Sequence, residues 1–250
     1  MRVDTVRIRK YQQRASKRRE DRVFIVEGIK MYRELPAEMI VQTVLSASFS
    51  KAHPEIKGDV IPDGEFEKIS DTKTPQGILA VARFYGYTAE DLLAAENGLF
   101  VVLENLQDPG NAGTILRSAE AAGASGVIFS SDSVDPYNSK VIRATMGSFF
   151  RVPFAVADDL RAVLEEIRLR GGRSYAAHLQ GAQDYDTADY RGLTAFVIGN
   201  ESQGLTEACA AACDARIRIP MLGKVESLNA AQAATVLLFE AASQRRKNVT

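Results

Sequence analysis

Apolar strand-like runs and amphipathic helix-like segments alternate through residues 99–250, and this alternation constrains the fold more than any other feature. Continuous apolar runs separated by helices are typical of a mainly parallel sheet covered by helices on both faces. The expected strands are 99–105, 126–131, 152–157, 173–179, 194–201 and 215–221, and the expected helices are 114–123, 139–148, 158–172 and 229–246. The sequence therefore predicts an α/β domain over residues 99–250.

Residues 1–84 carry shorter strands and helices, which indicate a second and smaller α/β sandwich. The expected strands are 22–28, 39–46, 59–62 and 77–84, and the expected helices are 29–36 and 64–70. Residues 85–98 are mixed and polar-ended, so we expect a linker with a helical turn there. Two domains joined by this linker fit the chain length of 250 residues.

Composition excludes several functional classes. No apolar run approaches the roughly 20 residues that span a bilayer, and the N-terminus lacks the apolar core of a signal peptide. We therefore expect a cytoplasmic protein without membrane contact. His53 and His178 lie far apart, and Cys209 and Cys213 lie one helical turn apart in an alanine-rich stretch. We interpret the cysteines as small core residues and expect no metal site.

The net charge of −1 attracts no polyanion, but residues 1–19 carry eight basic side chains against Asp4 alone. Such a block is typical of a nucleic-acid-binding arm, although a solvated terminus gives the same pattern. The candidate RNA contacts are Arg7, Arg9, Lys10, Arg14, Lys17, Arg18 and Arg19.

Three loops follow expected strands, where parallel sheets place their ligands. The first begins at Asp108 and runs through Gly110, Asn111 and Gly113 into the helix that carries Arg117. Its glycines would let the backbone bend and approach a ligand. An ordinary strand–turn–helix junction with a solvated arginine fits the same residues.

The second loop places Glu201 between glycines, as a site residue, a turn residue or the cap of the next helix. In the third loop Ser227 and Asn229 precede the long helix 229–246, and either could be its N-cap. Each loop alone thus has a purely structural interpretation as well as a functional one.

Taken together and in order, the three loops resemble the three motifs of the SpoU (TrmH-like) family of RNA 2′-O-ribose methyltransferases, within the SPOUT superfamily. The matching stretches are "DPGNAGTILRSAEAAG", "IGNESQGL" and "IPMLGKVESLN". Two further stretches, "FIVEGIKMYREL" and "DTKTPQGILAVA", resemble the family's N-terminal RNA substrate-binding domain, which is similar to a ribosomal-protein fold.

The resemblance implies an α/β catalytic domain whose C-terminal chain forms a deep trefoil knot, a homodimer with its active site close to the subunit interface, and S-adenosylmethionine as cofactor. It implies polar site residues at Asn111, Arg117, Glu201 and Asn229. It also implies cofactor contacts at Leu179, Gly199, Ile219, Met221, Leu228 and Asn229. With an RNA substrate expected, phosphate contact becomes the favoured interpretation of the basic arm.

One position departs from the family. The third motif often ends Ser-Leu-Asn-Val-Ser, whereas here Asn229 is followed by Ala230 and Ala231, so the second serine hydroxyl is absent. A mechanism that needs that hydroxyl is in doubt for this chain. A guanidinium stays protonated, so we expect Arg117 to act by charge rather than as a base.

Large-subunit (23S) rRNA is the expected substrate, and tRNA is the alternative. A non-catalytic RNA-binding protein that keeps the fold is a second hypothesis, because the serine is missing. A nucleotide-dependent oxidoreductase would need a Gly-x-Gly-x-x-Gly fingerprint, which "DPGNAG" does not provide.

Overall fold

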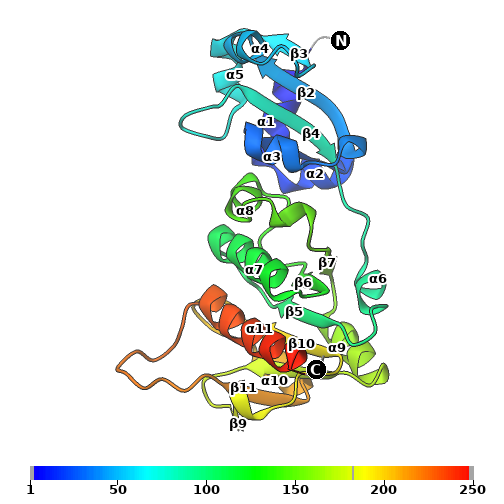
Figure 1. Ribbon diagram of the computed structural model, residues 1–250, viewed down its shortest axis with the longest axis vertical. Coiled ribbons are helices and arrows are strands. Elements are labelled where there is room, and N and C mark those ends of the chain that lie inside the picture. The colour runs from blue at the N-terminus through cyan, green and yellow to red at the C-terminus, as the bar shows by residue number, and fades with distance from the viewer. Residues whose placement is uncertain (1–2, 182, 248–250) are drawn as a thin grey trace. The chain divides into compact units, whose positions relative to one another are not determined.

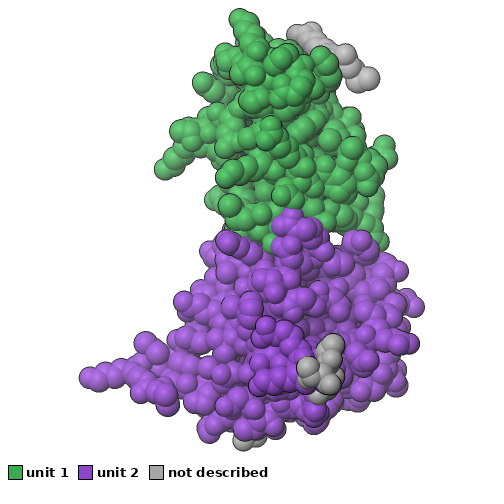
Figure 2. All heavy atoms as spheres, viewed as in Figure 1, with its two compact units in different colours: residues 1–86, 135–150 green, residues 87–134, 151–250 purple. Residues whose placement is uncertain are grey.

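The computed structural model describes residues 3–181 and 183–247, so Met1 and Arg2 of the basic arm lie outside the described residues. The chain divides into two compact units, coloured separately in Figure 2. The first unit contains residues 1–86 and 135–150, and the second contains residues 87–134 and 151–250. The segment 135–150, expected in the second domain, therefore packs with the first unit.

The described part of the first unit forms a four-stranded sheet in the order β1-β4-β2-β3. Its strands β2, β3 and β4 are labelled in Figure 1. Its strands are β1 (Val23–Glu27), β2 (Ile40–Ser46), β3 (Asp59–Ile61) and β4 (Ile78–Arg83). Its α-helices are α1 (Thr5–Gln13), α2 (Ala15–Asp21), α3 (Ile29–Glu34), α4 (Ala47–Ala52), α5 (Asp63–Ile69) and α8 (Ser139–Ala144). β4 runs antiparallel to both β1 and β2, and β3 runs parallel to β2. Helices α1, α2 and α4 were not expected, because short, highly charged or polar segments show little apolar periodicity.

The segment 135–150 is held in the first unit by aromatic packing and by a buried ion pair. Tyr137 stacks on Phe84 with ring centroids 3.6 Å apart, and Phe149 lies 5.3 Å from Phe24. The Arg18 side chain donates to Asp135 from Nε at 3.0 Å, and only 4% and 9% of these two side chains are exposed. Arg18 also donates to the carbonyl oxygen of Tyr11 at 2.6 Å.

The described part of the second unit forms a seven-stranded sheet in the order β7-β6-β5-β10-β8-β11-β9, with every adjacent pair parallel. The strands are β5 (Leu99–Leu103), β6 (Gly126–Ser130), β7 (Phe154–Ala157), β8 (Arg173–Ala177), β9 (Gln183–Asp184), β10 (Thr194–Ile198) and β11 (Ala215–Arg218). The α-helices are α6 (Ala89–Leu93), α7 (Pro109–Ala122), α9 (Leu160–Leu169), α10 (Glu207–Ala212) and α11 (Ala230–Arg246). The predicted parallel α/β architecture is confirmed.

Helices cover both faces of this sheet. Phe100 and Val102 of β5 point to one face, where they join a buried cluster with residues of α6, α9 and α10. Successive side chains of a strand alternate between the faces. On the other face, α7 and α11 lie side by side, and α11 also contacts β10 (Figure 1). The first and third candidate loops thus lead into neighbouring helices.

Helix α7 begins five residues earlier than the sequence analysis expected. Asp108 is its N-cap, with Oδ1 accepting from Asn111 N at 2.7 Å, and Pro109 occupies the first turn. Gly110 and Gly113 lie within α7 and neither has a positive φ, so the expectation that they form a bend before the helix is wrong. Proline is favoured at the first helical position, which makes Asp-Pro a helix start rather than a turn.

Among the described residues, no helix combines the length and apolarity needed to cross a membrane. Within the same ranges, no three histidine, cysteine, aspartate or glutamate side chains gather closely enough to hold a metal ion.

We predict that Arg18→Met lowers the free energy of unfolding by roughly 3–5 kcal/mol, because it leaves the Asp135 carboxylate buried without its partner. Urea unfolding followed by circular dichroism measures the change. Arg19→Met, at an exposed neighbouring position, is the control and should change stability by no more than about 0.5 kcal/mol. An Arg18→Met protein as stable as wild type would contradict a structural role for the pair.

Candidate functional site

The first two motif loops leave the sheet side by side. β5 and β10 are adjacent parallel strands at the centre of the sheet, and Leu103 pairs with Ile198 at their carboxyl ends. The chain continues from these ends into α7 on one side and into residues 199–206 on the other. Loops more than 90 residues apart in sequence therefore meet at one sheet edge.

Glu201 is bound to the start of α7 by three hydrogen bonds. Its carboxylate accepts from the backbone N–H groups of Gln107 at 3.2 Å and Asp108 at 2.9 Å, and from Asn111 Nδ2 at 3.0 Å. Burial tends to raise the pKa of Glu201, but the hydrogen bonds from Asn111 and these backbone groups outweigh it. The net pKa therefore lies below its ordinary value, and Glu201 stays ionised at neutral pH.

Asn229 connects the third loop to the same network. Its Nδ2 donates to Asn111 Oδ1 at 2.9 Å, while its Oδ1 accepts from Ala231 N at 2.9 Å and caps α11. The capping and site interpretations of Asn229 thus hold together, through different atoms of one side chain. Asn111 receives one neighbour on each of its amide atoms, which fixes the orientation of that amide.

Sequence reasoning missed two side chains that shape the second loop. Asn200 donates from Nδ2 to the carbonyl oxygen of Asn105 at 2.9 Å, and its Oδ1 accepts from Ser202 N at 2.9 Å. Glu104 accepts from Thr206 N at 2.8 Å, which secures the far end of the loop. Asn200 lies inside the second motif and Glu104 lies four residues before the first, but no spacing rule shows which backbone group each would bind.

The same loop makes glycine obligatory at position 199. Asn200 and Gly204 exchange backbone hydrogen bonds of 3.0 and 2.9 Å, which folds the loop back on itself. A Cβ atom on Gly199 would lie 2.2 Å from the carbonyl carbon of Gly204. Any larger residue at 199 would therefore displace the loop.

A cavity of about 480 Å³ lies between the second and third loops and the end of β8. Its lining includes five of the predicted cofactor contacts, namely Leu179, Gly199, Ile219, Met221 and Leu228, and also Glu201. Asn229 is not part of the lining, although its neighbours Leu228 and Ala230 are. The volume and the mixture of apolar walls with a few polar groups are those of a small-molecule site.

Arg117 lies apart from this hydrogen-bonded network. It is exposed on α7, and no described residue forms an ion pair or a hydrogen bond with its side chain. The structure thus brings Asn111, Glu201 and Asn229 together and leaves Arg117 available to a ligand.

The basic arm is mostly helical, and its seven candidate contacts differ in accessibility. Arg18 cannot contact RNA in this structure, because it is buried in its ion pair with Asp135, so that expectation is wrong. Arg7 is exposed and Lys17 is partly exposed, and both pair with Asp21, at 3.0 and 3.2 Å. Arg9, Lys10, Arg14 and Arg19 are also exposed and take no part in the contacts with Asp21.

Known proteins resemble both parts of the chain. Residues 98–239 match the SpoU rRNA methylase family, and residues 6–80 match the MRM3-like substrate binding domain. The 23S rRNA (guanosine(2553)-2′-O)-methyltransferase RlmP of Bacillus subtilis is 29% identical over 227 residues, 89% of each chain. The 23S rRNA (guanosine-2′-O-)-methyltransferase RlmB of Ralstonia nicotianae is 36% identical over 71% of this chain and 73% of its own.

The crystal structure of the SpoU methyltransferase AviRb from Streptomyces viridochromogenes, in complex with the cofactor AdoMet, superimposes with a TM-score of 0.87. It is 26% identical and covers 98% of this chain and 99% of its own. The family match spans more than half of the sequence and includes all three motif loops that meet around Glu201. The chain therefore belongs to the SpoU rRNA methylase family.

Proposed function

We propose that this chain transfers a methyl group from S-adenosylmethionine to a ribose 2′-hydroxyl of RNA, with 23S rRNA as the substrate. The observation that carries the proposal is the position of Glu201, which lines the cavity and also joins Asn111 and, through it, Asn229. Glu201 thereby connects the cavity to the side-chain amides of Asn111 and Asn229, whose orientations are fixed by hydrogen bonds. Relatives named as 23S rRNA 2′-O-methyltransferases support the choice of RNA.

The residues around the cavity fit S-adenosylmethionine. Ile198, Ile217 and Leu237 line it with apolar surface, which suits a flat adenine ring. Gly199 and the turn closed by Gly204 present backbone rather than side chains at one wall. Leu179, Ile219, Met221 and Leu228 would hold the nucleoside. When bound, S-adenosylmethionine supplies a methyl group on a sulfonium, which is already activated toward an oxygen nucleophile.

Polar side chains near the cavity would position the ribose and activate its 2′-hydroxyl. Arg117 is an exposed guanidinium without a protein partner among the described residues, so it can bind the phosphate next to the reacting sugar. Its charge lowers the pKa of the 2′-hydroxyl, and the proton leaves late, to water or to the phosphate. Asn111 and Asn229 orient the ribose, and Glu201 is a positioning residue that holds Asn111.

The missing serine hydroxyl does not remove a group on which this mechanism depends. Ala231 is 3% exposed inside the first turn of α11. Ser227 lines the cavity one residue before Leu228, so a hydroxyl is still present at the third loop. The proton is assigned to water or to the phosphate rather than to a protein group, in keeping with a role for Arg117 through charge.

Four further features belong to the proposal. The chain acts as a homodimer, with the site close to the subunit interface. It works in the cytoplasm, where ribosomal RNA is modified. Residues 199–229 and α11 would form the trefoil knot that the family resemblance implies. Arg9, Lys10, Arg14 and Arg19, all exposed, contact phosphates of the substrate.

Arg117→Ala should lower turnover by at least roughly 10²–10³-fold, because it removes charge stabilisation that only the reacting complex uses. Transfer of tritiated methyl to 23S rRNA measures the rate, and calorimetry should find the affinity for S-adenosylmethionine nearly unchanged. Arg161→Ala, an exposed arginine on α9, is the matched control and should keep full activity. Normal turnover in Arg117→Ala would refute the assignment, and a retained rate in Arg117→Lys would indicate charge rather than guanidinium geometry.

Glu201→Gln should destabilise the protein at neutral pH by roughly 0.5–1.5 kcal/mol, since a neutral amide cannot accept all three hydrogen bonds. The folded pKa of Glu201 is lowered from about 4.5, so its contribution is present above that pH and is lost as the pH falls. The stability gap between wild type and Glu201→Gln should therefore be constant from pH 8 to about pH 6 and narrow below about pH 4.5.

Urea unfolding at each pH measures this gap. Glu96→Gln, at an exposed position outside the network, should show no such narrowing. A gap for Glu201→Gln that is independent of pH would show that ionised Glu201 does not hold the loops.

A further inference from the structure

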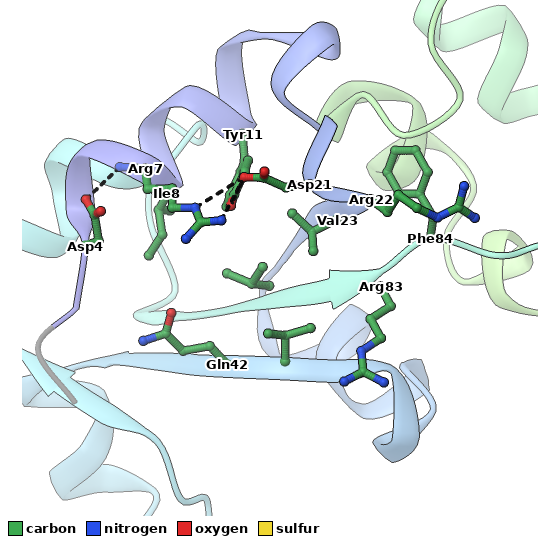
Figure 3. A pocket seen from close by; sticks show the side chains of 12 residues that line it. Asp4, Arg7, Ile8, Tyr11, Asp21, Arg22, Val23, Gln42, Arg83 and Phe84 are labelled. Carbon is green, nitrogen blue, oxygen red and sulfur yellow. Dashed lines mark hydrogen bonds and ion pairs between the residues drawn. The ribbon is translucent and has the colours of Figure 1, made fainter. Parts of the chain in front are cut away.

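The first unit contains a groove of about 610 Å³ between α1 and the strands β1, β4 and β2 (Figure 3). Ile8 and Tyr11 of α1 form one wall, and both belong to the buried core of the unit. Val23 and Val81 form an apolar floor, and Val41, which is 51% exposed, extends that floor toward solvent. Ile8, Tyr11, Val23 and Val81 are buried, so Val41 is the apolar side chain that this groove presents to solvent.

Three arginines surround this floor, and one of them is held in place. Arg7 donates to Asp21 at 3.0 Å, and the same carboxylate accepts from Tyr11 Oη at 2.6 Å (Figure 3). It also accepts from Lys17 Nζ at 3.2 Å. The hydrogen bond from Tyr11, followed by that from Arg7, lowers the pKa of Asp21 to about 2. The negative charge of Asp21 is therefore already satisfied within the fold.

The other two arginines are available. Arg22 and Arg83 are exposed, and no described carboxylate forms an ion pair with either of them. Asp4, the second acid of the groove, accepts from Arg7 N at 2.9 Å as the N-cap of α1. Both acids of the lining thus already accept hydrogen bonds within the protein. The positive charges of Arg22 and Arg83 therefore favour an anionic ligand.

The backbone at Arg22 is unusual for an arginine. It ends α2 with φ 52° and ψ 45°, in the left-handed region where glycine or asparagine is the ordinary residue. Residues held in such conformations gather at ligand-binding positions. The chain keeps an arginine at the groove where a glycine would fit with less strain.

We propose that this groove binds a single-stranded segment of the RNA substrate, with Arg22 and Arg83 on its phosphates and Val41 against an unstacked base or ribose. This inference rests on the proposed function for the identity of the ligand. Guanidinium groups bind phosphate oxygens in a bidentate manner, and an apolar floor suits a base removed from its stack. A duplex would present only its backbone and would leave the floor unused.

The test uses the full chain and a fluorescently labelled 12-nucleotide polyuridine RNA, with affinity measured by anisotropy over a series of salt concentrations. The double variant Arg22→Gly/Arg83→Gln should bind at least tenfold more weakly. The slope of log K against log salt should fall by about 1.4, because two phosphate contacts at about 0.7 each are lost. The single variant Arg22→Gly should melt no lower than wild type, since glycine relieves the left-handed backbone.

The matched control is Arg33→Gln/Lys68→Gln, which removes two exposed charges from α3 and α5, outside the groove. It should leave both affinity and slope unchanged. The proposal is overturned if the double variant binds like wild type, if the control weakens binding equally, or if wild type prefers a 12-base-pair RNA duplex. Calorimetry with S-adenosylmethionine separates the two claims, because failure of wild type to bind the cofactor overturns the proposed function and not the groove.

Discussion

The carboxylate of Glu201 is the interaction on which the candidate site depends. It accepts from two backbone N–H groups and from Asn111, and so joins the end of β10 to the start of α7. Hydrogen bonds to an ionised carboxylate are stronger than those between neutral groups. Glu201 also lines the cavity. One carboxylate therefore forms part of the proposed cofactor site and also positions Asn111, which is proposed to orient the ribose.

Asn229 extends this support to the third loop and does so without giving up its role in the fold. Its Oδ1 caps α11 while its Nδ2 holds Asn111 Oδ1. An aspartate at 229 would cap the helix equally well but would place a carboxylate against a carbonyl oxygen. The amide is therefore needed for the site and not for the helix. This distinction separates structural from functional roles within one residue.

The sequence was sufficient to predict most strands, the long helix α11 and five of the residues that line the cavity, because apolar periodicity and three motifs carry that information. It could not predict the segment 135–150 in the first unit, since the Arg18–Asp135 pair joins residues 117 positions apart. The same burial removed Arg18 from the candidate RNA contacts. The early start of α7 was readable from Asp108-Pro109, and was missed because two glycines resemble a loop.

The central claim is that the three loops form a site for methyl transfer to a ribose hydroxyl. The most direct measurement is to incubate the protein with tritiated S-adenosylmethionine and unmodified 23S rRNA, digest the RNA completely and separate the nucleosides. The account predicts label only in a 2′-O-methylated nucleoside, at a linkage that resists alkaline cleavage. Label on a base, or no label although the cofactor binds, would contradict it.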